Sequence, residues 1–303
     1  MAQMHGRSWL LYSFLVSIAL VFAAPTACGA TSAKEQLSKM TDQQFRHMQS
    51  LARRGDAGAA AVLGVAYEEG LRVERNIPQA VLWYQQAAEQ GDAEVQHHLG
   101  LMYEQGRGVT ADIKQAALWY ARAASLGYAP SQCNLGNLYR DGRGVRQDDE
   151  QAAKWYEIAA RQGDAQAQSN IGYMYNHGQG VIHDDQQAVY WYQKAAEQGF
   201  AIAQRNLGIM YMLGQGVQRN EAEAMRWFAK AAARGSQRAL VNQALLYMQG
   251  TQVQHDYAAA KHLLEEAISD GLEEAKPLLQ QCEQNLPRAE TSVSASASSK
   301  PTH

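Results

Sequence analysis

Histidine and cysteine are the side chains best suited to bind a metal or act as a nucleophile, and the chain has nine histidines and three cysteines. Their spacing fits no catalytic or metal-binding motif, since C-x-x-C, H-E-x-x-H, G-x-S-x-G and the phosphate-loop G-K-S/T are all missing from the sequence. His97 and His98 are adjacent, so they point to different faces of a helix. We predict no catalytic residue, no metal, no cofactor and therefore no enzymatic activity.

A step of 36 residues organises most of the chain. It separates glycines (Gly55, Gly91, Gly127, Gly163, Gly199, Gly235, Gly271), tyrosines (Tyr67, Tyr103, Tyr139, Tyr175, Tyr211, Tyr247) and tryptophans (Trp83, Trp119, Trp155, Trp191, Trp227). A fixed period of roughly 20–50 residues is typical of stacked repeats. Such an array offers a long surface rather than an enclosed cleft, which favours binding over catalysis.

Each unit is expected to form two helices. In the fourth unit a helical pattern ends at Gly178, and Asp184 with Gln187 predicts the capping box of a second helix that ends at Gly199. The second-helix N-cap is Asn or Asp in all six units: Asn76, Asp112, Asp148, Asp184, Asn220 and Asp256. Because Asn and Asp favour helix N-caps, the repetition predicts six helical hairpins.

Glycine also recurs in the middle of the first helix, at Gly64, Gly100, Gly136, Gly172 and Gly208. Glycine at such a position costs roughly 1 kcal/mol relative to alanine. A repeated cost suggests a repeated gain. We expect close approach of the two helices, with the Trp and Tyr of the second helix beside each glycine.

These units resemble the SEL-one-like repeat (SLR), a relative of the tetratricopeptide repeat. In the second unit the pattern is carried by Ala93, Leu99, Gly100, Tyr103, Gly106, Gly108, Val109, Asp112, Ala116, Trp119, Tyr120, Ala123, Ala124 and Gly127. The resemblance implies an all-α, right-handed α/α superhelix, a solenoid of six 36-residue hairpins whose first helices line a concave face. It also implies an envelope or secreted bacterial protein. A link of cysteine-rich members with penicillin binding does not carry over, because this chain lacks their paired cysteines and S-x-x-K.

The repeats are predicted over residues 56–271, between a capping helix in 31–55 and another in 272–286. The sixth unit departs from the pattern at Ala244, Gln252 and Leu263-Leu264. Residues 287–303 lack apolar periodicity and are predicted to be disordered. Cys133 and Cys282 are four repeats apart, on the order of 40 Å if each repeat adds roughly 10 Å, so no disulfide is expected.

Residues 1–30 have the layout of a signal peptide. Arg7 precedes an apolar run over 10–22, and small residues follow, with Ala23 and Ala30 as candidate cleavage points. We expect a periplasmic or secreted protein. The alternatives are an uncleaved membrane anchor or a lipidated Cys28, and membrane contact is expected only in those cases. A net charge of −3 and the absence of basic runs predict no nucleic-acid partner.

Positions that vary between units are free for function. With Asp56 as position 1, the variable first-helix positions are 6, 10, 13 and 14, which share one helix face. We call this face the first-helix stripe. Its predicted partner-binding residues are Asn137, Arg140, Tyr173, Asn176, His177, Arg205, Ile209, Met212, Leu213 and Met248. The stripe is polar in the early units and apolar from the fourth, and these apolar residues either bind a partner or pack on the next repeat.

The sequence therefore predicts an exported, non-enzymatic scaffold or adaptor that binds a protein or peptide through its concave face. Arg205 beside Tyr173 is a candidate for binding a carboxylate or stacking on an aromatic ring. The alternatives are an envelope glycan-binding or cell-wall enzyme accessory protein, with Tyr173 as a platform, and a weak hydrolase acting through a groove His or Ser.

Overall fold

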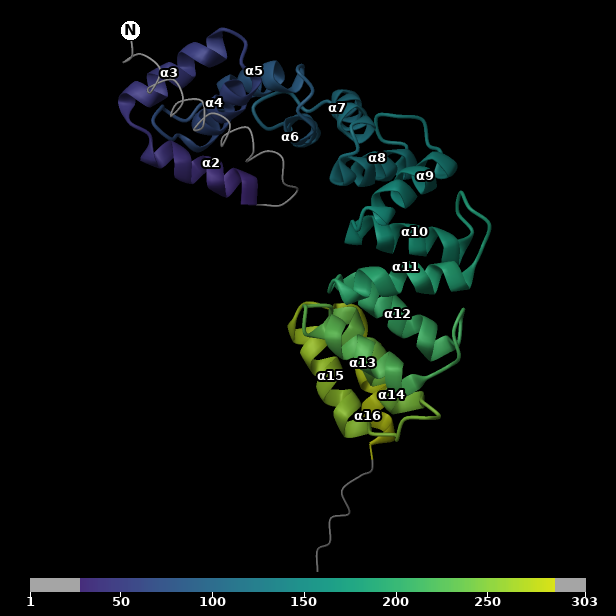
Figure 1. Ribbon diagram of the computed structural model, residues 1–303. Coiled ribbons are helices and arrows are strands. Elements are labelled where there is room, and N and C mark those ends of the chain that lie inside the picture. The colour runs from purple at the N-terminus through teal and green to yellow at the C-terminus, as the bar shows by residue number, and fades with distance from the viewer. Residues whose placement is uncertain (1–27, 287–303) are drawn as a thin grey trace, which may run out of the picture. The chain divides into compact units, whose positions relative to one another are not determined.

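The computed structural model describes residues 28–286, with side chains from residue 33 on, and every regular element in that stretch is a helix (Figure 1). The elements are α2 (Cys28–Lys39), α3 (Asp42–Arg53), α4 (Ala57–Glu69), α5 (Ile77–Ala88), α6 (Ala93–Gln105), α7 (Ile113–Ser125), α8 (Ala129–Asp141), α9 (Asp149–Arg161), α10 (Ala165–His177), α11 (Asp185–Glu197), α12 (Ala201–Leu213), α13 (Glu221–Ala232), α14 (Gln237–Gln249), α15 (Tyr257–Ser269), the 3-10 turn η1 (Glu273–Ala275) and α16 (Lys276–Asn285). Most of the predicted leader and the predicted disordered tail, 287–303, lie outside the described residues.

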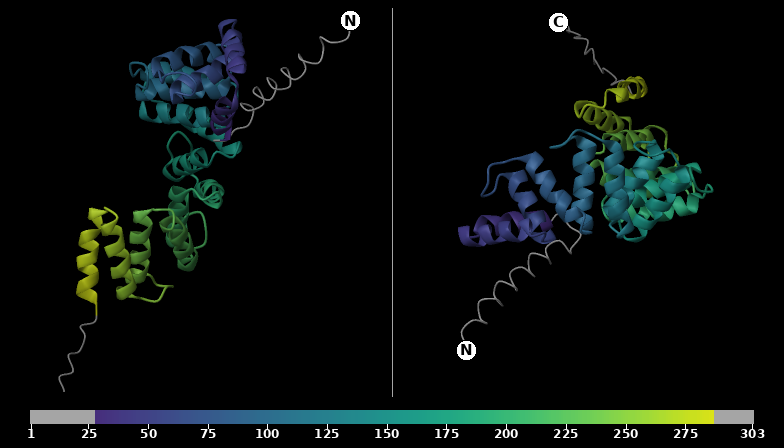
Figure 2. Two further views of the ribbon diagram at one scale, coloured as in Figure 1. Left: turned by 90° about the vertical axis from the view of Figure 1, so that its left-hand side faces the viewer. Right: turned by 90° about the horizontal axis from the view of Figure 1, so that it is seen from above.

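The chain forms two compact units that divide within α11, the N-terminal unit (1–191) and the C-terminal unit (192–303). Inside each unit, consecutive helices pack against one another in chain order (Figure 2). The hairpins α4–α5, α6–α7 and α8–α9 belong to the first unit, and α12–α13 and α14–α15 to the second. The predicted all-helical solenoid of repeated hairpins is confirmed.

At the start of each second helix, the backbone N–H of the N-cap residue donates to a tyrosine carbonyl of the preceding helix. Each second-helix N-cap accepts the expected bond; Asp148, for example, accepts from the backbone N–H of Gln151 at 2.9 Å. Gln151 does not return a bond to the Asp148 N–H, because that N–H donates to the carbonyl of Tyr139 at 3.0 Å. The same holds at Asp184, whose N–H donates to the carbonyl of Tyr175 at 3.0 Å, so the capping box predicted there with Gln187 is wrong. α3 does have a full box, between Thr41 and Gln44.

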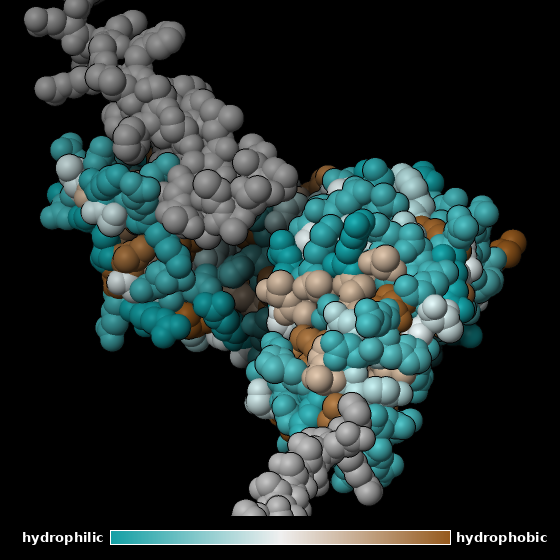
Figure 3. Space-filling view, turned by 90° about the horizontal axis from the view of Figure 1, so that it is seen from below, coloured by the Kyte–Doolittle hydropathy of each residue, from teal (hydrophilic) through white to brown (hydrophobic). Residues whose placement is uncertain are grey.

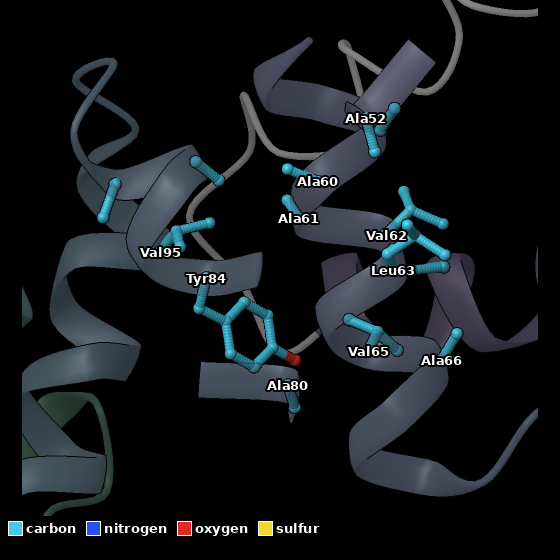
Figure 4. Close-up of a cluster of buried hydrophobic side chains, with 14 of the residues drawn as sticks. Ala52, Ala60, Ala61, Val62, Leu63, Val65, Ala66, Ala80, Tyr84 and Val95 are labelled. Carbon is cyan, nitrogen blue, oxygen red and sulfur yellow. The ribbon is translucent and has the colours of Figure 1, made fainter. Parts of the chain in front are cut away.

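The mid-helix glycines do lie at close contacts, and the contacting ring is tyrosine or phenylalanine rather than tryptophan. A Cβ on Gly136 would lie 2.7 Å from the Tyr156 ring, and one on Gly208 would lie 2.5 Å from Phe228. In the first repeat, Tyr84 fills the same place next to α4, among small and branched side chains (Figure 4). Any side chain at these glycines would displace the ring.

Buried glutamines join one repeat to the next. Gln96 is 4% exposed and donates to the carbonyl of Ala88, which ends the preceding hairpin, at 2.8 Å. The same bond recurs in later repeats from Gln132, Gln168 and Gln204 to Ala124, Ala160 and Ala196. A buried helix end needs such a partner. This contact is not among the predicted ones, although the glutamine recurs every 36 residues and that recurrence was its sequence signal.

The N-terminal end of the array has one more helix than predicted. The one capping helix predicted in 31–55 is present as α3, and α2 precedes it, with Ala33 and Leu37 fully buried. Because α2 packs on α4, the apolar surface of the first repeat is covered. α2 begins at Cys28, within the segment 1–30 predicted as leader.

The sixth repeat compensates for its missing loop glycine with a buried carboxylate. Glu221 is fully buried and accepts backbone bonds from Thr251, Gln252 and Val253 at 3.1, 2.7 and 3.1 Å. These bonds, with Arg219 beside it, outweigh burial and hold the pKa of Glu221 at about 2.

The C-terminal cap is η1 followed by α16, a shorter helix than predicted for 272–286. α16 packs on α15 and buries Cys282 completely. Cys133 is also buried, and both thiols are free, as predicted. None of the helices within residues 28–286 is both long and apolar enough to cross a membrane.

Candidate partner-binding surfaces

The first helices of the N-terminal unit form a hollow of about 310 Å³, which we call the N-terminal pocket. Its lining comes from α2, α4, α5, α6, the loop after α6 and the N-cap of α8, and consists of Lys34, Val65, Glu68, Glu69, Tyr84, Glu94, Val95, His97, His98, Arg107 and Tyr128. Most of these side chains are ionisable, but carbon atoms make up most of the surface that lines the pocket. None of the lining residues is among the predicted partner-binding residues.

Glu68 is the hub of this pocket. The Tyr84 hydroxyl donates to it at 2.6 Å, His98 Nε2 lies at 3.0 Å and the Arg107 guanidinium at 2.6 Å. Burial raises the pKa of Glu68, but His98, Tyr84 and Arg107 outweigh it and bring the pKa to about 2. A buried carboxylate with three partners is a structural ion cluster as well as a wall of the pocket.

Two other ionisable groups in the pocket have shifted pKa values. Burial, with the nearby Asp92 charge, raises the pKa of Glu94 to about 7. Burial, with His98 nearby, lowers the pKa of His97 to about 4, and His97 Nδ1 lies 2.8 Å from Ser131 Oγ. At neutral pH His97 is therefore uncharged, while Glu94 changes charge state near that pH.

The contacts of Glu68 repeat one step along the array. Glu104 accepts from Tyr120 at 2.8 Å and pairs with Arg143 at 3.2 Å, as Glu68 does with Tyr84 and Arg107. In both cases a stripe glutamate pairs with an arginine 39 residues later. The predicted polar part of the stripe is therefore largely occupied in holding successive repeats together.

The predicted residues of the N-terminal unit make contacts of their own. Asn137 accepts from Tyr156 at 2.7 Å and from Asn170 at 3.2 Å, so it replaces the glutamate of earlier repeats. Arg140 pairs with Asp141, and Asn176 donates to Asp185 at 2.8 Å.

Tyr173 and His177 are exposed on α10. Tyr173 is 41% exposed, and its ring stacks on His177 with centroids 3.9 Å apart. One face of the Tyr173 ring is therefore covered by His177, which lies one helical turn further along α10.

The apolar stripe of the C-terminal unit is only partly available. Met248 is 4% exposed and packs in the core of the last repeat. Its prediction as a partner-binding residue is therefore wrong. Met212 and Ile209 are half-buried against the cluster around Phe228. Leu213 is 55% exposed.

Phe228 explains why this part of the stripe is apolar. It stands where Tyr84 and Tyr120 stand in earlier repeats, and Met212 stands where Glu68 and Glu104 stand. Because phenylalanine has no hydroxyl, no acceptor is needed opposite it, and methionine packs against the ring instead. The Tyr-to-Phe change was the sequence signal for this exchange.

Arg205 and Ile209 line a second hollow, the C-terminal pocket, of about 230 Å³. Its other lining residues come from α14 and from the end of the array: Arg238, Val241, Asn242, Leu272, Glu274 and Ala275. Arg205 and Tyr173, which the sequence analysis placed together, belong to different units, and each is described within its own unit.

The face seen in Figure 3 is mostly hydrophilic, with separate groups of apolar residues. Exposed apolar side chains also occur on second helices, at Leu82 and Leu118, and the sequence analysis did not consider them. Among the residues described, no three His, Cys, Asp or Glu side chains are grouped to hold a metal ion.

Comparisons with known proteins agree with the repeat architecture. The Sel1 repeat model matches residues 57–92, 93–128, 129–164, 165–200, 201–236 and 238–272. A Sel1 repeat protein of Oxalobacter formigenes is similar in structure, with a TM-score of 0.66 and 32% identity over 78% of this chain and 96% of that one. No curated protein sequence matches the chain.

A protective antigen of uropathogenic Escherichia coli that displays an SLR fold is also similar, with a TM-score of 0.75 and 27% identity. That match covers 90% of this chain and 60% of the antigen, so the chain spans less than two thirds of that relative. Sel1 repeat proteins generally act as scaffolds for other proteins. With six consecutive matches over most of its length, this chain belongs to the Sel1 repeat family.

Proposed function

We propose that this protein is a non-enzymatic scaffold that binds a protein partner through the first-helix stripe, chiefly in its C-terminal unit. The observation that carries the proposal is the contrast within one helix, α12. Its packing positions repeat those of other units, whereas Leu213 is 55% exposed and Arg205 lines an open pocket. An exposed apolar side chain beside a charged pocket suits a protein interface better than a catalytic centre.

Site-specific photocrosslinking in the native host tests this surface. A photoreactive residue at Leu213 should capture one discrete protein, identified by mass spectrometry, whereas a probe at Ala229, exposed on α13, should not. A third probe at Leu118 samples the exposed apolar side chains of the second helices. Capture from Leu118 alone would place the interface there. Equal capture from all sites, or none, would contradict the proposal, and retention on peptidoglycan would then favour a glycan-binding role.

We further propose that the protein works in the bacterial envelope or outside the cell. The apolar run over 10–22, with Arg7 before it and small residues after it, supports export. Fusing alkaline phosphatase after residue 60 should give an active enzyme, since it folds only after export. An active fusion that stays in the membrane fraction would indicate an anchored or lipidated protein, and an inactive fusion would exclude export.

A further inference from the structure

The C-terminal pocket has an imbalance of charge. Arg205 on α12 and Arg238 on α14 both line it, and Glu274 is the one acidic side chain among its lining residues. Glu274 pairs with Arg238 at 3.2 Å, and both side chains of this pair are more than 60% exposed. An exposed pair of this kind is weak and easily rearranged. Arg205 has no carboxylate partner among the described ion pairs.

The Arg205 guanidinium is poorly satisfied. Its Nε is buried and has no hydrogen-bond partner, and a terminal nitrogen donates only to the neutral Asn206 side chain at 3.1 Å. Burial, with the nearby Arg238 charge, lowers the pKa of Arg205. Arginine remains charged at neutral pH even so. A buried charged donor without an acceptor is costly, so its presence calls for an explanation.

The other residues of the pocket indicate which kind of ligand would pair with the Arg205 guanidinium. Ile209, Val241 and Leu272 supply apolar walls, and Asn242 adds an amide. Along α12, Ile209 and Leu213 follow Arg205 at steps of four residues, so the three side chains share one face over about 12 Å. An acidic group at Arg205 with apolar side chains beyond it would match this row.

We propose that the C-terminal pocket binds an acidic side chain of a partner protein, whose carboxylate accepts from the terminal N–H groups of Arg205 and whose neighbouring apolar residues contact Ile209 and Leu213. Arginine offers two parallel N–H donors to a carboxylate, which a neutral amide cannot accept in the same way. The inference rests on the proposed scaffold function and names the chemistry of the partner.

The first test repeats the Leu213 crosslinking in full-length Arg205→Met and Arg205→Lys variants. Arg226→Met is the matched control, since Arg226 is an exposed arginine of the same unit that pairs only with Glu223. We expect at least a tenfold loss of crosslinked partner with both Arg205 variants and no change with Arg226→Met. Capture from wild type that persists in the Arg205 variants would overturn the carboxylate site and leave the scaffold function standing. No capture even from wild type would count against the scaffold function itself.

The second test measures stability, where a binding role and a structural role predict opposite results. If Arg205 serves a ligand, Arg205→Met removes an unsatisfied buried donor, and the Tm of the free protein stays unchanged or rises. If Arg205 instead supports the fold, Tm falls, which would overturn the proposal.

The third test separates a protein side chain from a small anion. Three probes are added separately to the full-length protein: the blocked peptide acetyl-Leu-Glu-Leu-amide, the same peptide with Gln in place of Glu, and acetate. For each probe the chemical shift of the Arg205 Nε–Hε NMR signal is measured. A shift with the Glu peptide at a concentration where the other two have no effect supports the proposal. An equal response to acetate would mean a general anion site, an equal response to the Gln peptide would exclude carboxylate recognition, and no shift with any probe would also overturn it.

Discussion

At the scale of single residues, one hydroxyl group controls the character of the first-helix stripe. Tyr84 and Tyr120 are buried and each needs an acceptor, which Glu68 and Glu104 provide. The glutamates in turn need arginines, and the result is a row of ion pairs between repeats. Where phenylalanine replaces tyrosine, neither the glutamate acceptor nor its arginine partner is needed. The polar-to-apolar gradient along the stripe is thus partly a packing effect rather than a record of the partner.

Exchanging Phe228 tests this explanation. Phe228→Tyr should cost about 1–3 kcal/mol in the free energy of unfolding, because its hydroxyl would be buried opposite Met212 without an acceptor. Adding Met212→Glu should recover much of that loss, as Glu68 does for Tyr84. Urea denaturation of the two single variants and the double variant gives the coupling free energy. A coupling near zero would show that the hydroxyl and the stripe residue are independent.

Glu68 should make the N-terminal unit sensitive to acid. Glu68→Gln should cost about 3 kcal/mol at neutral pH, because Arg107 and His98 lose a buried carboxylate partner. Folding lowers the pKa of Glu68 to about 2 from 4.5, so its contribution is complete above pH 4.5 and is lost as the pH falls toward 2.

The measurement is the difference in unfolding free energy between wild type and Glu68→Gln from pH 7 to pH 2. This difference should shrink steadily below pH 4.5. A difference that stayed constant over the whole range would mean that the charge of Glu68 does not stabilise the fold.

At the scale of helices, the backbone of the repeat tyrosine decides how the second helix begins. The N-cap side chains behave as the sequence predicts, but their own N–H groups bind tyrosine carbonyls instead of the N3 side chains. The Gln or Glu at N3 is therefore not needed for capping. Sequence reasoning that considers one helix at a time could not see this, since the acceptor lies on the preceding helix.

In the third repeat, the contributions of the N-cap residue Asp148 and the N3 residue Gln151 to stability can be measured separately. Asp148→Ala should cost about 1 kcal/mol, because it removes the acceptor for the Gln151 N–H. Gln151→Ala should change stability by less than about 0.5 kcal/mol, because its side chain does not complete a box. Thermal unfolding of the two variants gives the comparison. Equal losses would restore the capping-box interpretation.

At the scale of the whole molecule, the sequence predicted the architecture far better than the site. The 36-residue period gives the hairpins, and the N-cap residues and helix-ending glycines give their boundaries, because these features are local. Exposure along the stripe depends on contacts between repeats. Met248 and Leu213 are both apolar stripe residues, yet one is buried in the last repeat and the other is exposed. Neither pocket could be found from one repeat, since each is lined by several helices.

Solenoid stability is a sum of neighbouring contacts, so an end cap should affect its own end most. α16 packs on α15, and the fully buried Cys282 of α16 lies 3.1 Å from the carbonyl of Tyr257 on α15. Ending the chain before residue 276 would remove this cover from α15. Hydrogen exchange should then speed up in α14 and α15, while α4 to α8, in the other unit, keep their protection.

A truncation ending at residue 286 is the matched control, because it keeps α16 and removes only residues 287–303. It should leave the exchange of every helix unchanged. Loss of protection throughout the shorter protein would show that the two units unfold together, as an enclosed core does. Loss confined to the last hairpin would instead mean that the α14 side of the C-terminal pocket can be lost without disturbing the ion-pair row of the N-terminal unit.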